Sequence, residues 1–418
     1  MPIDAAGTRV VITAYGSCSA AGDTAGLWSS SLVKQSCLAT ADPFSSDCPV
    51  SVVGRIDSEF TDVFPKKVNS FVSRHTKLGA VAISECIARS GLAEAAVRQT
   101  GLLFGSTSHG QDRVKEMVET LGSVPFPEID YNIVNSISNA GSSSLLAAHF
   151  NLHGYVHSIE AASCSAMLSL LTGRMAVRSG LCTRVLCAVG EANLFPATFL
   201  FYSRRVRLDG ATYTFFGKQR DPEERAPDAF VVPFCSPPIS DRGAIAEGGC
   251  CILLESLESA QSRGAEILGE LEDVEYFFHS DGYHGIDKEL TGLKNVLQKY
   301  QGLPIDSLYL PVTGSYPLDV GLYTMASTIF PKTHAFSVEP IIGHTGAATT
   351  LFNVTLALKS LAGKVLLPTR NLRHNDFDPA CRLLPSDDPR EKRQLSRILV
   401  ASCGWGGYSG ACIIRTYG

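Results

Sequence analysis

The segment "SIEAASCSAMLSLLTGRMAVRSG", residues 158–180, places a serine and a cysteine at the start of an expected helix. It is typical of a strand end, a tight turn and a helix that begins with small residues. The unpaired N–H groups at a helix start favour negative charge, so a cysteine there can become a thiolate nucleophile. A serine in the same place needs an adjacent base. Ser163 and Cys164 are therefore the candidate nucleophiles.

Histidines supply the candidate base and a candidate metal site. His344 in "EPIIGHTGAATT" is the candidate base, or else a structural histidine whose ring bonds the loop backbone. His149, His153 and His157 recur at every fourth residue, as metal ligands on one helix face would, but Gly154 interrupts that helix. The segment "GSTSHG" also lacks the lysine of a phosphate-binding loop. We therefore expect no metal and no bound cofactor.

The composition is that of a folded protein with a large core. The chain has 418 residues, of which 45% are hydrophobic and 18% charged, and its net charge is −5. Its 13 cysteines never form a CxxC pair, and many lie in apolar runs, which is typical of a reduced compartment. It has no apolar run long enough to span a membrane and no signal-peptide pattern near its start. We expect a cytoplasmic protein without nucleic acid or membrane as a partner.

Strand and helix patterns alternate along the whole chain and indicate an α/β fold. Apolar runs predict buried strands at 9–16, 101–107, 184–190 and 249–255. Helical periodicity predicts a helix over 75–92 and another over 346–363 that Gly363 closes. Residues 396–418 predict two strands around a glycine-rich turn. These patterns favour two similar halves that meet near residue 256.

Several segments together resemble the β-ketoacyl synthases, in the order and at the spacing of that family. They are "VVITAYGSCSAAGDTAGLW", the segment 158–180, "DRGAIAEGGCCILLESLESAQSRGAEILGEL", "EPIIGHTGAATT" and "ASCGWGGYSGACIIR". The resemblance implies a thiolase fold with two related α/β halves in five layers, αβαβα. It places the nucleophile turn in an N-terminal half, 1–255. It places the His344 loop and the gating loop in a C-terminal half, 256–418.

The resemblance also shows which of the family's catalytic groups are replaced. The family's cysteine stands 17 places before a glycine, and Gly180 is 17 places after Ser163 (180 − 163), so Ser163 takes its position. Cys164 comes one residue later and is expected to point about 100° away around the helix. Pro311 stands in place of the first histidine, and Glu339 in place of the lysine. His344, the second histidine, is retained, so we expect Ser163 to be inactive in condensation.

Four further residues match positions that shape the substrate tunnel or its gate in the family. Asp319 follows the segment of the lost histidine, and Glu247 matches an acid that orders the loops around the site. Trp405 replaces the aromatic gate residue of a G-F-G-G loop, and Cys403 lies beside it. The alternative for Trp405 is a tryptophan of the core.

This pattern resembles a chain-length factor, the subunit of type II polyketide synthases that pairs with an active ketosynthase. The expected partners are that ketosynthase and an acyl carrier protein, whose phosphopantetheine arm carries the acyl chain. Two alternatives stay open: a serine acyltransferase that uses Ser163 and His344, and a homodimeric scaffold that binds carrier proteins. Residues 207–227 do not match the family, and the pattern leaves the product and its length open.

Overall fold

The fold is taken from a computed structural model. It describes residues 7–41, 48, 50–125, 128, 132–203, 205–208, 211–214, 226–235, 242–280, 287, 289–314, 316–372, 383–385, 389–391 and 394–418. Most of the unmatched segment 207–227 lies outside these residues.

The described strands of the main sheet form two sets with the same pairing. In the first set the order is β6-β5-β7-β11-β1, and in the second it is β14-β13-β18-β19-β12. In each set the first three strands run parallel, and the last two pairings are antiparallel. The first set is β1 (Val10–Ser19), β5 (Gly101–Gly105), β6 (Val156–Ile159), β7 (Arg184–Glu191) and β11 (Gly248–Ser256). The second set is β12 (Gly269–Phe278), β13 (Ser307–Tyr309), β14 (His334–Phe336), β18 (Arg397–Gly404) and β19 (Tyr408–Arg415).

The two sets join edge to edge through a short pairing of β1 with β12, which makes one continuous sheet of 12 strands among the described residues. Smaller strands extend or flank this sheet. They are β2 (Gly22–Asp23), β3 (Ala39–Thr40), β4 (Val52–Gly54), β8 (Arg205–Leu208), β9 (Ala211–Thr214), β10 (Ile245–Ala246), β15 (Val365–Leu366), β16 (Leu384–Pro385) and β17 (Arg390–Glu391).

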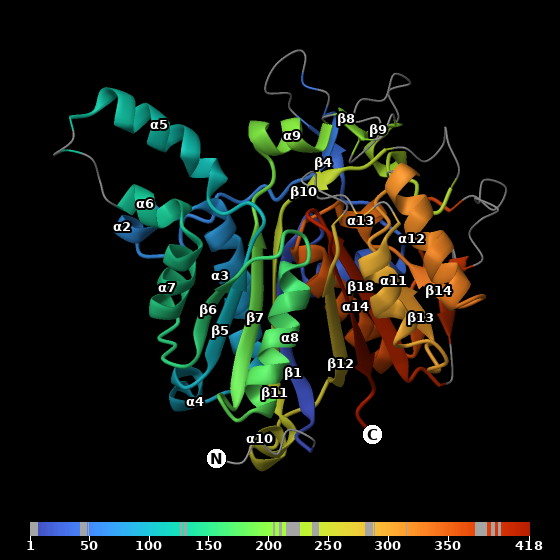
Figure 1. The fold of residues 1–418 in the computed structure, drawn as a ribbon. Coiled ribbons are helices and arrows are strands. Elements are labelled where there is room, and N and C mark those ends of the chain that lie inside the picture. The colour runs from blue at the N-terminus through green and yellow to red at the C-terminus, as the bar shows by residue number, and fades with distance from the viewer. Residues whose placement is uncertain are drawn as a thin grey trace.

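Helices cover both sets in layers (Figure 1). α8 (Ser165–Arg178) and α14 (Ala348–Gly363) contact each other and strands of both sets, so they form the central layer. α3 (Arg74–Ser90) and α7 (Asn139–His149) cover the outer face of the first set. α11 (Thr291–Gln298), with α12 (Tyr316–Ile329) beside it, covers the outer face of the second. The expected five-layer αβαβα thiolase fold is confirmed.

The remaining helices connect these layers. They are α1 (Thr24–Leu32), α2 (Lys66–Asn69), α4 (Glu94–Arg98), α5 (Val114–Ser123), α6 (Asn132–Ile137), α9 (Pro196–Ser203), α10 (Leu257–Ser262) and α13 (Glu339–Ile342). Within the described part of the chain, no helix combines the length and apolar character that crossing a bilayer requires.

The expected elements form for the reasons that their sequences indicate. β7 and β11 are continuous apolar runs because helices cover both of their faces, and nearly all of their residues are buried. α3 ends where Gly91 takes a left-handed conformation with φ of 64°, as a helix-closing glycine does. One detail was wrong: Gly363 is the last helical residue, and Lys364 takes the left-handed position with φ of 53°.

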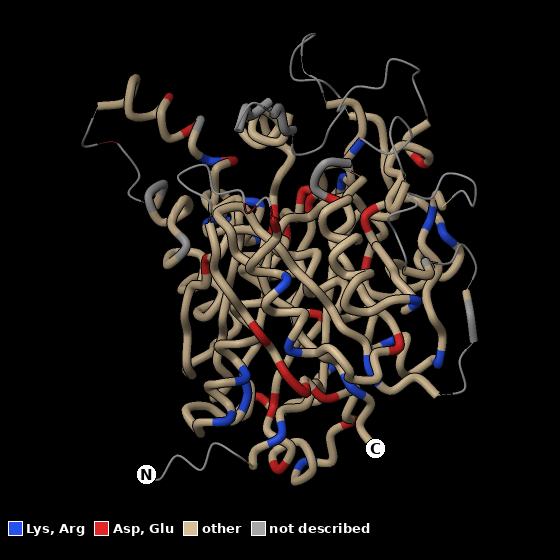
Figure 2. Tube along the Cα trace, turned by 45° about the vertical axis from the view of Figure 1, so that its right-hand side comes forward, with Lys and Arg blue, Asp and Glu red and all other residues tan. Residues whose placement is uncertain are grey.

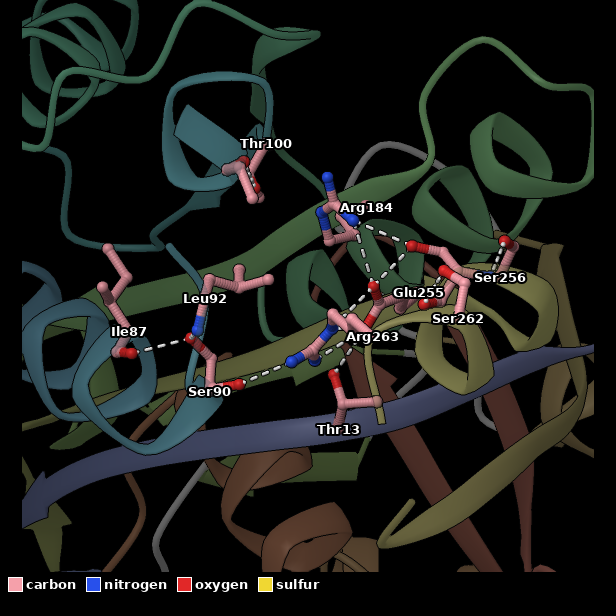
Figure 3. A network of polar contacts seen from close by, with 12 residues as sticks. Thr13, Ile87, Ser90, Leu92, Thr100, Arg184, Glu255, Ser256, Ser262 and Arg263 are labelled. Atoms are coloured by element: carbon pink, nitrogen blue, oxygen red, sulfur yellow. Dashed lines mark hydrogen bonds and ion pairs between the residues drawn. The ribbon is translucent and has the colours of Figure 1, made fainter. Parts of the chain in front are cut away.

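A buried ion-pair cluster ties the lower end of the first strand set together (Figure 3). Glu255, at the end of β11, is fully buried and accepts hydrogen bonds from Arg263, Arg184 and Thr13. Burial alone would raise the pKa of Glu255, but the bonds from Arg263 and its neighbours hold it below the usual value. Arg263 also donates to the carbonyl of Ser90 at 2.8 Å. Figure 2 shows acidic and basic residues intermixed at this end of the molecule, where the C-terminus lies.

Candidate functional site

Residues from distant segments line one cavity of about 150 Å³. Ser163, Pro311 and His344 all contribute to its wall. Ser163 comes from the turn before α8, Pro311 from the end of the β13 segment, and His344 from the loop between α13 and α14. The strands deliver these loops to one end of the sheet, where they can meet.

The turn before α8 presents Ser163 to the cavity and turns Cys164 away from it. Ala162 has φ of 48°, a strained value for alanine, and the first helical residue is Ser165. The Cys164 side chain is fully buried, with Sγ 3.4 Å from both Ser402 Oγ and the Tyr408 carbonyl oxygen. Burial raises the pKa of the Cys164 thiol well above its ordinary value, which opposes a thiolate.

His344 is held in place by its backbone and by Glu339. Its N–H donates to the Ala244 carbonyl at 2.7 Å, and its own carbonyl accepts from Ala246 at 2.8 Å. Its Nδ1 lies 3.1 Å from Oε1 of Glu339, which is 1% exposed. Burial alone would lower the pKa of His344, but the carboxylates of Glu339, Glu191 and Asp319 raise it. Glu339, which the resemblance placed at the family's lysine position, is thus the direct partner of His344.

Glu191 is a buried carboxylate that the sequence analysis missed. It lies at the end of β7 and accepts hydrogen bonds from the Thr107 amide at 2.9 Å and from the Ala347 amide at 3.0 Å. Burial raises the pKa of Glu191. It ties the loop after β5 to the loop that carries His344. An acid at the end of an otherwise apolar strand was the signal for it.

The Pro311 segment is fastened by Asp319. The Asp319 carboxylate accepts from the Thr313 and Gly314 amides at 3.1 and 2.6 Å. Gly314 has φ of 86°, and a Cβ there would lie 2.4 Å from the Arg242 carbonyl oxygen, so this turn requires glycine. Burial raises the pKa of Asp319 to about 7. Pro311 itself offers no side-chain donor or titrating group to the cavity.

Aromatic side chains close the cavity over Ser163. Trp405, in the turn between β18 and β19, meets Phe201 edge to face at 5.5 Å between ring centroids. Tyr202 shares a hydrogen bond with Ser163, and its ring stands edge to face against His344 at 5.8 Å. Sequence reasoning missed Phe201 and Tyr202, although the apolar run "FPATFLFY" after β7 marked an unusual helix.

Cys403 and Asp287 are two further residues of the cavity wall. Cys403 lines the cavity, and burial raises the pKa of its thiol to about 12. Asp287, also missed, lines it as well. Its Oδ2 accepts from Gly292 at 2.8 Å, while its Oδ1 has no hydrogen-bond partner among the described residues.

Glu247 is not among the residues that line this cavity, and it lies at a separate hollow beside Arg74. Both of its carboxylate oxygens bind Arg74 at 2.7 Å, and it accepts from the Ile56 amide at 2.9 Å. This geometry agrees with an acid that orders neighbouring loops. His149, His153 and His157 do not share a helix face, because α7 ends at His149 and β6 contains His157.

Comparisons with known proteins agree with this architecture. Residues 8–232 match the family model described as "Beta-ketoacyl synthase, N-terminal domain". A putative polyketide beta-ketoacyl synthase 1 of Streptomyces halstedii is 21% identical over 360 residues, covering 82% of this chain and 81% of that protein. The 3-oxoacyl-[acyl-carrier-protein] synthase 1 of Escherichia coli K12 is 24% identical over 374 residues, covering 87% of each.

Solved structures show the same fold. The ishigamide ketosynthase/chain length factor matches with a TM-score of 0.82 at 20% identity, over 98% of this chain and 100% of that one. A ketosynthase chain from a type II complex with its acyl carrier protein matches with a TM-score of 0.81 at 17% identity, over 98% and 100%. The chain therefore belongs to the β-ketoacyl synthase family and has its thiolase fold.

Proposed function

We propose that this chain is a chain-length-factor subunit without condensing activity of its own. It pairs with an active ketosynthase and shapes the space that holds the growing acyl chain. An acyl carrier protein presents that chain on its phosphopantetheine arm, and the cysteine of the partner carries out the condensation.

The observation that carries this proposal is at the nucleophile turn, where a serine stands at the position of the family's cysteine. Ser163 faces the cavity, whereas the thiol of Cys164 is buried against Ser402 and Tyr408. A serine hydroxyl is almost wholly protonated at neutral pH and depends on an adjacent base, so it is a much weaker nucleophile than the thiolate that condensation of a growing chain requires. The cysteine that does line the cavity, Cys403, has a thiol pKa raised to about 12 by burial.

The charges around the cavity also oppose condensation. Decarboxylation of a malonyl unit develops negative charge, which donors and cations stabilise. Here Pro311 replaces a donor, and the carboxyl groups of Asp287 and Asp319 line the same wall. The Glu339 carboxylate lies 3.1 Å from Nδ1 of His344. Each acid placed near a developing enolate raises the barrier in a site of low dielectric constant.

The surface offers a place for a partner chain. β6 lies at the end of the sheet order, so one of its edges has no neighbouring strand among those described. On the same side of the molecule, α5 extends away from the body (Figure 1) and exposes Val114, Val118 and Leu121 along one face. A free strand edge and an exposed apolar helix on the same side of the molecule are typical of an interface between subunits. The structural neighbour described as a ketosynthase/chain length factor supports such a pairing.

Co-expression with a ketosynthase encoded beside this chain tests the proposal. The purified complex is given the carrier protein and malonyl units, and its products are analysed by mass spectrometry. Replacing the partner's cysteine should abolish the product, because that thiolate loads the chain. Leu322→Ala and Phe201→Ala enlarge the cavity. Each change should therefore lengthen the acyl chain of the product. Condensation by this chain alone, or a product that survives loss of the partner's cysteine, would refute the proposal.

A further inference from the structure

We propose that the cavity is also a serine acyl-transfer site that hydrolyses short acyl thioesters, with Ser163 as nucleophile, His344 as base and Glu339 as the residue that positions His344. This activity is distinct from chain-length control, which breaks no bond, and it needs no partner subunit.

The acid and the base are already paired. Glu339 is fixed on the first turn of α13, and its Oε1 lies 3.1 Å from Nδ1 of His344. When Nδ1 donates its proton to this carboxylate, the lone pair of the ring resides on Nε2, which is the tautomer that a base requires. Two backbone hydrogen bonds to Ala244 and Ala246 fix the loop that carries the ring. A lysine at position 339 would not provide this arrangement, since an ammonium group accepts no hydrogen bond.

The serine lines the same small space as His344. Ser163 and His344 both line the cavity, and Tyr202 joins them through its hydrogen bond to Ser163 and its ring contact with His344. Burial, with the charges of Glu191 and Glu339, raises the pKa of Tyr202, so its phenol stays protonated as a hydrogen-bond partner of the serine. α8 begins two residues after Ser163 and directs its positive end to this turn, which favours an oxyanion there.

Gly404 packs closely against the backbone of the turn that carries Ser163. A Cβ on Gly404 would lie 3.1 Å from the backbone nitrogen of Ser163. The cavity of about 150 Å³ is of the size that holds a molecule such as benzene. Its wall includes Phe201, Leu322 and Trp405, which are suited to an apolar chain. The site therefore fits a short acyl group.

The reaction balances without a further reactant except water. Ser163 Oγ attacks the thioester carbonyl carbon, and its proton passes to Nε2 of His344. The carbon–sulfur bond then breaks, and the thiolate takes that proton and leaves as a thiol. Water attacks the resulting acyl-serine with His344 again as base. The carboxylic acid departs, and the proton returns to Ser163.

The test uses the purified full chain and butyryl-N-acetylcysteamine as the thioester. Hydrolysis is followed by thiol release, and the acyl-enzyme by intact-protein mass spectrometry. We expect turnover above the buffer rate and a butyryl adduct that maps to Ser163. Ser163→Ala should remove both, whereas Cys164→Ala, a matched control whose thiol points away from the cavity, should keep both. A fluorophosphonate probe should label Ser163 in the unmodified chain, which tests the nucleophile without a substitution.

The variant Glu339→Gln tests whether Glu339 positions His344 for catalysis or only supports the fold. It should lower kcat on the order of 10²–10⁴-fold. It should also move the low-pH limb of kcat to lower pH, because the charge that raises the pKa of His344 is gone. An unshifted limb would overturn the role of Glu339. Hydrolysis at the buffer rate together with no adduct and no probe label on the folded chain, or full activity of Ser163→Ala, would overturn the whole proposal.

Discussion

Asp319 carries its carboxyl group at the wall of the cavity, where burial and hydrogen bonds act on it in opposite directions. Burial is the larger influence and raises the pKa to about 7, although the Thr313 and Gly314 amides lower it. Near neutral pH this residue therefore changes charge in the folded chain. The nearby Glu339 carboxylate adds to the raised value, so the two acids of the site are linked.

This shift predicts a stability that falls as pH rises. Between pH 4 and 7 folded Asp319 keeps a proton that the unfolded chain, with a pKa near 3.8, has released. The contribution of Asp319 to the free energy of unfolding should therefore decrease by about 2 kcal/mol from pH 5 to pH 7. Urea unfolding at pH 5 and at pH 7 measures this decrease in the free energy of unfolding. The variant Asp319→Asn should lack this part of the pH dependence. This part should persist in Asp57→Asn, an exposed control; an equal slope in all three proteins would contradict the prediction.

At the scale of elements, α3 packs closer to its sheet than side chains would permit. Gly16, Gly249 and Gly190 lie on β1, β11 and β7 and face the helix backbone. A Cβ at these positions would lie 2.2, 2.2 and 1.9 Å from carbonyl oxygens of α3. Because α3 leads from the Arg74–Glu247 pair down to Ser90 beside the Glu255 cluster, this contact fixes two polar clusters at once.

Gly190→Ala should therefore destabilise the fold. The methyl group meets the backbone of α3, which cannot move aside as a flexible side chain can, so the helix must shift. We expect a loss of about 1–3 kcal/mol or more in the free energy of unfolding. Gly122→Ala in α5, where a Cβ meets open space, is the matched control and should gain about 0.5–1 kcal/mol. Chemical unfolding measures both, and equal stabilities of the two variants would argue against close packing of α3.

At the scale of the whole molecule, the two strand sets place their loops at one end and leave β6 at one side. The central helices α8 and α14 each begin beside the cavity, so the two halves contribute Ser163 and His344 in equivalent ways. The cavity thus lies between the halves, while α5 and β6 extend the first half outward. A partner on that side would leave the cavity wall intact.

Charged residues on α5 should therefore weaken the complex without affecting the fold. Val118 is 60% exposed and Leu121 56% exposed. Replacing both with aspartate should raise the Kd for the ketosynthase by about 10–10³-fold, since an apolar contact would then bury unpaired charge. Native mass spectrometry at several concentrations measures this. Val33→Asp, at an apolar position 67% exposed but outside α5, should leave the affinity unchanged; equal effects of the two changes would exclude α5 from the interface.

The sequence was sufficient to predict the layered α/β fold. Strands such as β7 and β11 are continuous apolar runs, and such runs are readable because burial on both faces leaves no polar alternation. The resemblance gave Ser163, Pro311 and His344 as candidate site residues, and the structure brings all three to the wall of one cavity.

The tertiary structure alone decided what those residues touch. The contact of Glu339 with His344 was not inferred although they lie five residues apart, because loop geometry aims the two side chains. Tyr202 at Ser163, Asp287 in the cavity wall, and Glu191 at Ala347 join segments far apart in the chain. Glu247 likewise forms an ion pair with Arg74 and does not line the cavity. Periodicity and spacing report which face of an element is buried, but contacts between distant loops arise only when the sheets and helices pack.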